Sequence, residues 1–344
     1  MLPYFVLFLL PAVGALFPFM RAKHIQQTAF VAFAILATLI MGLRYQVGAD
    51  WEVYFEYLNS ADNLIAALVL PDPGYMMLNW LSIELGLGIA GVNLIGSGIF
   101  VFGLLDFCRR QPFPWLGLAV AVPYLLIVVG MGYSRQAIAL GFIFLSFSCW
   151  GKSEFLKYLL LIFLAATFHK TAVVMILFGL FMGRVRIAIR SLLFCFFLIL
   201  FVYIFMYNKI FQAQIDNHIT QINYESEGAL VRLSMNLAPV FIYLFYYKRF
   251  SIFADNKLMV MMSGLIIASV PFIFKYSTVV DRILVYLTPI QVVVYSRLPL
   301  FAKGAAWRRL LTSIIVMIYG LVLWVWMNYG ANAAFWVPYD WLIY

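Results

Sequence analysis

Long apolar runs separated by short polar segments occupy most of this 344-residue chain. A transmembrane helix needs about 20 mostly apolar residues, because the hydrocarbon core of a bilayer is about 30 Å thick. Charged residues make up only 11% of the chain, whereas a soluble domain carries roughly 25%. The sequence therefore predicts an all-α polytopic membrane protein. It excludes a soluble protein, a disordered chain and an outer-membrane barrel, whose strands alternate polar and apolar residues.

We expect about twelve transmembrane helices, within a range of about 11 to 13. The candidate spans are about 1–20, 25–43, 90–107, 115–131, 135–150, 155–168, 171–183, 190–207, 231–247, 258–275, 282–298 and 310–328. Residues 75–88 are apolar but short and contain Glu84. We expect a partly inserted helix there, with Asp72 as its N-cap and Pro73 at its first helical position.

Charge distribution predicts the orientation of the chain. If the N-terminus lies outside, 16 of the 23 Lys and Arg residues fall in cytoplasmic loops, together with only three of the 14 acidic residues. The net charge of +9 is then an orientation signal, and nucleic acid is not expected as a partner. The whole chain, 1–344, is expected to be one transmembrane domain. Its longest non-membrane segments are 44–74, 208–230 and the tail 329–344, all on the outer face.

The first outer segment begins with the polar and aromatic run Arg44–Trp51. Gly48 permits a tight turn, and Asp50 opens a helical stretch whose aromatic residues, Tyr54 among them, share one face. Such a helix would lie on the bilayer surface with its aromatic side chains down. Two interpretations are open here. Asp50 and Arg44 are either functional, or they are a helix N-cap and an arginine that reaches up to the interface.

A second polar cluster surrounds Arg135, which follows Ser134 and precedes Gln136 at the start of a span. A cation at a helix N-terminus opposes the helix dipole unless an anion is present. Arginine combined with backbone N–H groups binds phosphate well. The cluster is therefore either an anion site or a tight polar turn.

Two further clusters contain His169-Lys170 and Asp281-Arg282. A His/Lys pair at a narrow polar hinge can bind an anion or move a proton, or can simply cap a loop. Asp281 and Arg282 are sequence neighbours and do not face each other on a helix, so Asp281 either serves the site or pairs with another loop. Arg232, at the start of its own span, is a weaker candidate.

These clusters together predict a cavity at the outer face that contains several cations and two or three carboxylates. Arginines would neutralise a lipid-linked pyrophosphate and stabilise its departure, while a carboxylate or histidine would take a proton from an acceptor hydroxyl. No metal or cofactor is implied, because the acidic residues lack ligand spacing.

The order of these motifs resembles that of the EpsG-like family of membrane polysaccharide polymerases. The run R-Y-x-V-G-A-D-W-x-x-Y, which starts at Arg44, is similar to the family's first-loop signature, where G-T-D often replaces G-A-D. Asp72–Tyr75 resembles its E-P-G-F element, with Asp for Glu and Tyr for Phe. Tyr133–Ala137 resembles its S-x-R-Q-x-x-A element, Phe168–Thr171 its F-H-K-[ST] element, and Asp281 with Arg282 a less distinctive site.

This resemblance covers roughly residues 40–290 and implies a Wzy-type O-antigen or capsule polymerase with a GT-C-like fold. Such an enzyme joins repeat units carried on undecaprenyl pyrophosphate at the outer face of the bacterial inner membrane. Asp50 would be the general base, with His169 as its rival. The implied substrate and pyrophosphate ligands are Arg44, Arg135, Lys170 and Arg282, joined by Arg232, Gln136, Tyr54 and Asp281.

Two other functions compete with the polymerase. A flippase for lipid-linked sugars would need paired repeats and broken helices near the middle of the membrane, and no internal repeat is visible in the sequence. An outer-face sugar acyltransferase would use His169 as its base but would leave the arginines without a task. Membrane lipid is an expected partner, and the sequence leaves open whether a chain-length regulator protein is another.

Overall fold

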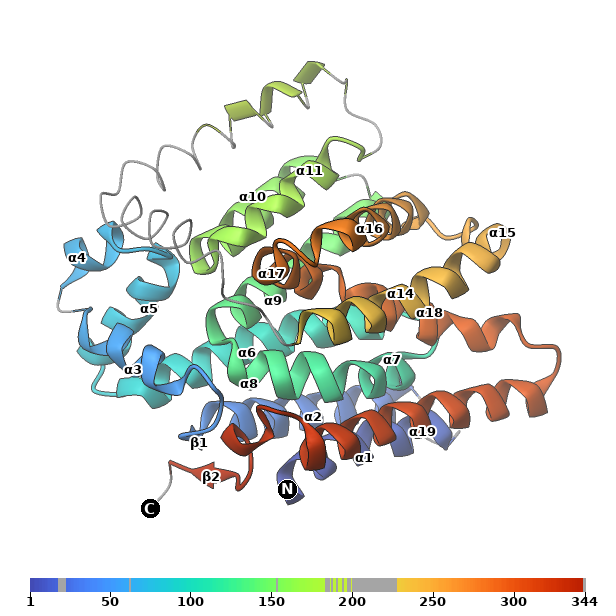
Figure 1. The fold of residues 1–344 in the computed structure, drawn as a ribbon, viewed down its shortest axis with the longest axis horizontal. Helices are drawn as coiled ribbons and strands as arrows, with labels where there is room; N and C mark the ends of the chain where they lie inside the picture. Colours follow the sequence, from blue (N-terminus) through green and yellow to red (C-terminus); the bar gives the residue numbers. More distant parts are fainter. Residues whose placement is uncertain are drawn as a thin grey trace.

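The computed structural model describes residues 1–17, 23–61, 63–152, 154–182 and 228–342, with a few positions between 186 and 199. In chain order its elements are α1 (Leu2–Leu16), α2 (Lys23–Gly42), β1 (Arg44–Tyr45), α3 (Trp51–Asn59), α4 (Leu64–Val69), α5 (Pro73–Glu84), α6 (Gly88–Arg109), α7 (Pro114–Ala121), η2 (Val122–Val129), α8 (Gly130–Gly132), α9 (Ser134–Lys152), α10 (Phe155–Phe168), η3 (Lys170–Met175), α11 (Ile176–Gly179), α14 (Ala229–Phe245), α15 (Tyr247–Phe250), α16 (Asn256–Ser269), η4 (Val270–Phe272), α17 (Ser277–Leu287), α18 (Pro289–Arg297), η5 (Leu298–Phe301), α19 (Ala305–Tyr329), η6 (Ala333–Phe335) and β2 (Asp340–Trp341) (Figure 1). Apart from the two short strands, every one of these elements is a helix, so the predicted all-α class is confirmed.

Four described helical stretches are long and apolar enough to cross a membrane: His24–Gly42, Gly88–Arg109, Pro114–Gly132 and Ala305–Tyr329. A bent pair, Ser277–Leu287 with Pro289–Phe301, would make a fifth span. The other apolar helices are 10–17 residues long. The predicted number of about twelve spans is therefore not confirmed. The expected span at 190–207 and the expected loop at 208–230 lie largely or wholly outside the described residues.

The bent pair turns by 41° between α17 and α18. Pro289 has no N–H to continue the helical hydrogen bonds, and a polar network supports the break. Asn236 donates to the Leu284 carbonyl at 3.1 Å and accepts from Gln291 at 2.9 Å, while Tyr319 donates to Gln291 at 2.8 Å. These buried groups satisfy one another and fix the direction of α17.

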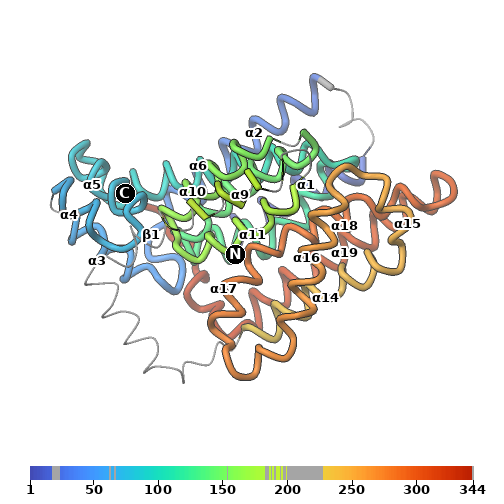
Figure 2. Tube along the Cα trace, turned by 90° about the horizontal axis from the view of Figure 1, so that it is seen from above, coloured from blue at the N-terminus to red at the C-terminus, as the bar shows by residue number. Residues whose placement is uncertain are grey.

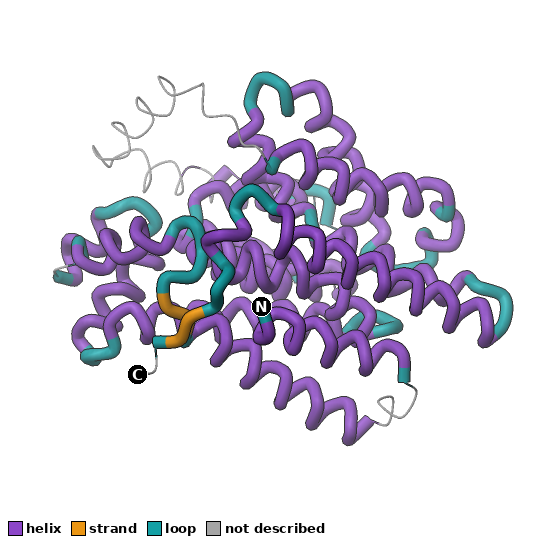
Figure 3. Tube along the Cα trace, turned by 60° about the horizontal axis from the view of Figure 1, so that its bottom comes forward, coloured by secondary structure: helices purple, strands orange, loops and turns teal. Residues whose placement is uncertain are grey.

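The short helices α3, α4 and α5 gather at one end of the bundle, which we call the site end (Figure 2). The chain terminus returns to this end, where β2 pairs antiparallel with β1 (Figure 3). The predicted helix near 75–88 is α5, Pro73–Glu84, and it begins at Pro73 as expected. At 12 residues it is too short to cross a bilayer by itself.

Candidate functional site

Three separate segments of the site end meet at the carboxylate of Asp72, which is 1% exposed. Arg135 donates from Nη1 to Oδ2 at 2.7 Å, and the backbone N–H of Lys170 donates to Oδ1 at 3.0 Å. The imidazole Nδ1 of His169 lies 3.7 Å from Oδ2. One carboxylate therefore ties the start of α5 to the start of α9 and to the turn between α10 and η3.

The structure corrects the interpretation of Asp72 as a capping residue. Asp72 does occupy the N-cap position of α5, but its side chain makes no capping hydrogen bond. Its backbone is left-handed, with φ of 56°, and its carboxylate bonds to Arg135 instead. Burial raises the pKa of Asp72, but the nearby His169 imidazole and the Arg135 charge outweigh it, so the net pKa falls below its ordinary value. The carboxylate is therefore ionised at neutral pH.

Arg135 receives the anion that its position at a helix start requires. Besides the ion pair with Asp72, its guanidinium lies 4.5 Å from the centre of the Tyr57 ring, a cation–π distance. Its side chain is still 22% exposed. Arg135 is thus held firmly from two sides and keeps an accessible edge.

His169 interrupts the helical path between α10 and η3 with an extended backbone. Its side chain is buried, and Nδ1 has no hydrogen-bond partner among the described residues. Burial lowers the pKa of His169, and the Arg135 and Arg282 charges lower it further, against the opposing effect of Asp72. The imidazole is therefore neutral at pH 7, with a ring nitrogen able to accept a proton.

Arg282 lies on α17, half-buried, and its charge acts on Asp50, His169 and Lys170. Its backbone carbonyl accepts a 2.8 Å hydrogen bond from Gln136, which fixes α17 against α9. No hydrogen bond or ion pair joins its guanidinium to the residues that the structure describes. Burial lowers the pKa of Lys170, and the charges of Arg135 and Arg282 add to that effect, as expected for cations that share one region.

Asp50 immediately precedes α3 but makes no capping hydrogen bond with its side chain. Asp50 therefore occupies the N-cap position that the plain interpretation expects, but its side chain does not cap the helix. Burial raises the pKa of Asp50, while Arg135 and Arg282 partly oppose the shift. A carboxylate with raised proton affinity beside two arginines is suited to accept a proton from a substrate.

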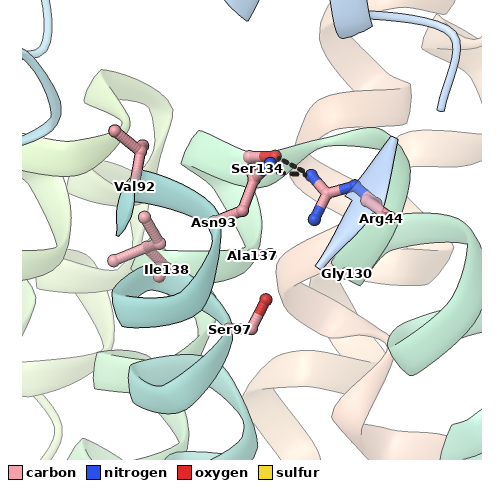
Figure 4. A pocket seen from close by; sticks show the side chains of 9 residues that line it. Arg44, Val92, Asn93, Ser97, Gly130, Ser134, Ala137 and Ile138 are labelled. Atoms are coloured by element: carbon pink, nitrogen blue, oxygen red, sulfur yellow. Dashed lines mark hydrogen bonds between the residues drawn. The ribbon is translucent and has the colours of Figure 1, made fainter. Parts of the chain in front are cut away.

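Arg44 does not reach up to the bilayer interface, because its side chain is buried between α6 and α9. It donates to Ser134 at 2.7 Å and to Asn93 at 3.1 Å (Figure 4). It also donates to the backbone carbonyls of Met41, near the end of α2, and of Val47. The adjoining cavity measures about 10 Å³, room for one water at most. The geometry does not support the expected contact between Arg44 and pyrophosphate. Arg44 instead fixes Ser134, the residue before Arg135.

A second ion pair joins Arg232 to Asp281. The Arg232 guanidinium lies 5.5 Å from the centre of the Tyr124 ring and 5.8 Å from that of Tyr133. Asp281 therefore pairs with another segment, as the plain interpretation of its position predicted. Tyr54 is buried against Tyr75, with ring centres 5.8 Å apart, and supports the site by packing.

The structure thus brings Asp50, Arg135, His169, Lys170 and Arg282 into one region. Sequence reasoning missed Asp72 as the residue that joins them. The signal was present in the Asp-Pro-Gly-Tyr element. An Asp before a helix that starts with Pro is typical of a cap, and with that interpretation the Asp72 carboxylate was not counted among the site residues.

Comparison with curated proteins and with solved structures finds no match. The family model described as the EpsG family matches residues 27–341. This range covers nearly the whole chain and includes every residue of the site. The EpsG family is a Wzy-like polysaccharide polymerase family, and the chain is a membrane protein of this family by both its apolar helices and its match. We conclude that the chain belongs to the EpsG family.

Proposed function

We propose that this protein is a glycosyltransferase with a GT-C-like fold that joins oligosaccharide repeat units carried on undecaprenyl pyrophosphate. It would act at the outer face of the bacterial inner membrane, in contact with membrane lipid. The observation that carries the proposal is the convergence of Arg135, Lys170 and Arg282 beside Asp50 and His169. A positive region next to two proton acceptors suits a reaction that releases an anion and a proton together.

The cations where these segments meet outnumber the carboxylates. One of the carboxylates, Asp72, is already bonded to Arg135 and to the Lys170 backbone. A pyrophosphate would supply the missing negative charge. The Arg282 guanidinium, with no described partner, would take one phosphate, and the exposed edge of Arg135 would take the other. Arginine suits this task because its planar donors match phosphate oxygens in pairs.

The transfer balances without a cofactor. A hydroxyl oxygen on the terminal sugar of the acceptor unit attacks the anomeric carbon of the donor chain and forms the new glycosidic bond. The bond from that carbon to the pyrophosphate oxygen breaks, and its electron pair leaves with the undecaprenyl pyrophosphate. The arginines stabilise this developing charge. The hydroxyl proton passes to the base.

We assign the base to Asp50 and keep His169 as its rival. Asp50 has a raised proton affinity and lies on the first loop, where it can approach a substrate that enters beside α3. His169 is neutral but buried, and it lies against Asp72. On this assignment His169 and Asp72 keep Arg135 in place, while Asp50 carries the proton.

The outer-face assignment rests on the excess of Lys and Arg in the loops that the sequence predicts to be cytoplasmic. Such an enzyme would receive its substrates after they have crossed the membrane. A chain-length regulator would meet it on the same face.

The first experiment is a gel of surface glycolipids from the host with this gene deleted. The proposal predicts that a ladder of repeat units collapses to the single unit, and that the intact gene restores it. A ladder that persists with changed mobility would indicate a modifying acyltransferase. Loss of every band, including the single unit, would indicate a flippase. Either of the last two results would overturn the proposal.

A further inference from the structure

The last described residues of the chain lie directly against the segment that leads to Asp50. In the β1–β2 pair, Arg44 stands opposite Trp341 and Tyr45 stands opposite Asp340 (Figure 3). The backbone N–H of Leu342 extends the contact and donates to the Leu43 carbonyl at 2.8 Å. We call residues 333–342 the C-terminal clamp.

Gly48 is held between the clamp and the turn that precedes α9. Its N–H donates to the Phe335 carbonyl at 2.8 Å. Its φ of 108° is one that glycine adopts readily, and a Cβ there would lie 2.5 Å from the Met131 carbonyl oxygen. Asp50 follows two residues later, so the backbone that carries it is set by contacts on both sides.

Trp336 is the centre of the clamp and is 1% exposed. Its indole N–H donates to the Ile127 carbonyl at 3.1 Å, and its own carbonyl accepts from the Tyr4 hydroxyl at 2.5 Å. The ring lies so close to the backbone of Gly132 that a Cβ there would come within 2.5 Å of it. Arg135, which lies in the site, follows three residues after Gly132. The indole thus packs against the segment that leads to Arg135, while the preceding residue, Phe335, holds the segment that leads to Asp50.

We propose that the C-terminal clamp sets the distance between Asp50 and Arg135, and that Trp336 is a positioning residue for the transfer step. The proposal rests on the function proposed above, which gives these two residues their roles. Trp336 is too deeply buried to touch a substrate. A misplacement of about 1 Å between reacting groups can cost about a hundredfold in rate. The clamp should therefore affect turnover more than substrate binding.

The test uses the full-length enzyme in lipid, supplied with the undecaprenyl-pyrophosphate-linked repeat unit isolated from the deletion host. For Trp336→Ala we expect kcat to fall about 10- to 100-fold and KM to change less than about threefold. Trp324→Ala is the matched control, because Trp324 is exposed on α19 and its ring packs against Tyr329, outside the clamp. It should keep wild-type values. Wild-type kcat in Trp336→Ala, or a change confined to KM, would overturn the proposal.

A milder variant covers the case in which Trp336→Ala does not insert. Trp336→Phe keeps a ring over Gly132 and loses the hydrogen bond to Ile127, so kcat should fall about three- to tenfold. A disulfide between β1 and β2 should restore the lost kcat. Tyr45 and Asp340 face each other across the strand pair, where Cα atoms lie about 4.5–5.5 Å apart, a distance that a disulfide spans.

Oxidation of Tyr45→Cys/Asp340→Cys, in a Cys195→Ser background, should therefore recover most of the kcat that Trp336→Phe loses. A disulfide that forms without recovery of kcat would overturn the proposed role of the clamp.

Failure of the proposed function and failure of the proposed clamp give different results. No elongation by the wild-type enzyme in this assay would overturn the proposed function, whereas a clamp failure leaves wild-type elongation intact and removes only the effect of Trp336.

Discussion

Arginines lie at both ends of the bundle, but the two ends use them in different ways. At the end of α6 away from the site, Arg297 donates to both oxygens of Asp255 at 2.8 and 2.6 Å and to Gln111 at 3.1 Å. Its guanidinium also lies 4.2 Å from the centre of the Phe253 ring. At the site end, Arg135 shares one carboxylate with two neighbours, and Arg282 has no described partner.

This difference distinguishes an arginine that stabilises the fold from one that is available to bind a ligand. A buried charge is costly unless it is paired and hydrogen-bonded. Arg297 meets that condition within the protein, whereas Arg282 at the site end would meet it only with an additional anion. The predictions below test this contrast, from the largest expected effect to the smallest.

The largest effect should come from Asp50→Asn. The amide keeps the shape of the side chain but cannot accept a proton, so kcat should fall about 10²- to 10⁴-fold, the range for loss of a general base. Turnover of the purified enzyme on the lipid-linked repeat unit measures it. Glu52→Gln, a change in the first turn of α3, is the control. An active Asp50→Asn enzyme would transfer the base role to His169.

Arg282→Ala should lower kcat about 10²- to 10³-fold, or about 2.7–4 kcal/mol, as for other charge-stabilising donors. The substitution removes no hydrogen bond or ion pair to a described residue, so thermal stability should stay near the wild-type value. Lys303→Ala, an exposed cation beyond η5, serves as the control. Wild-type chain lengths from Arg282→Ala would count against the pyrophosphate site.

Arg297→Ala should show the opposite pattern. Removing one partner of a buried ion pair typically costs 3–5 kcal/mol, and we expect about 3 kcal/mol because the Asp255 side chain is 22% exposed. Thermal unfolding in detergent measures the loss. The protein that remains folded should turn over at a near wild-type rate, and the exposed Arg309→Ala should change neither quantity. A selective loss of kcat in Arg297→Ala would remove the distinction between the two ends.

The sequence allowed long helices to be placed well, because an apolar run must be helical to cross a membrane. The expected spans at 90–107 and 310–328 correspond to α6 and α19. The residues that converge at the site were also found, since isolated charges at the ends of apolar runs are easy to see. What the sequence could not show is which partner each charge takes. Asp72 meets Arg135 across 63 positions, and Arg44 points inward to Asn93 and Ser134.

The smallest effect is a shift in pH dependence that links Asp50 to Arg282. Burial raises the pKa of Asp50, so the acid limb of kcat should lie above the ordinary carboxyl range, with activity lost as pH falls and Asp50 is protonated. Arg282 opposes that rise. Its removal in Arg282→Gln should therefore move the acid limb of the residual activity to higher pH.

Arg282→Lys keeps the positive charge and provides the control. Its limb should stay at the wild-type pH even if its rate falls, because a lysine loses the paired donors of arginine but not the charge. A limb that moves equally in both variants would mean that Arg282 acts on the site through its shape. A limb that moves in neither would mean that Asp50 is not the group whose protonation ends the reaction, and that the positive charge at the site end is not coupled to its base.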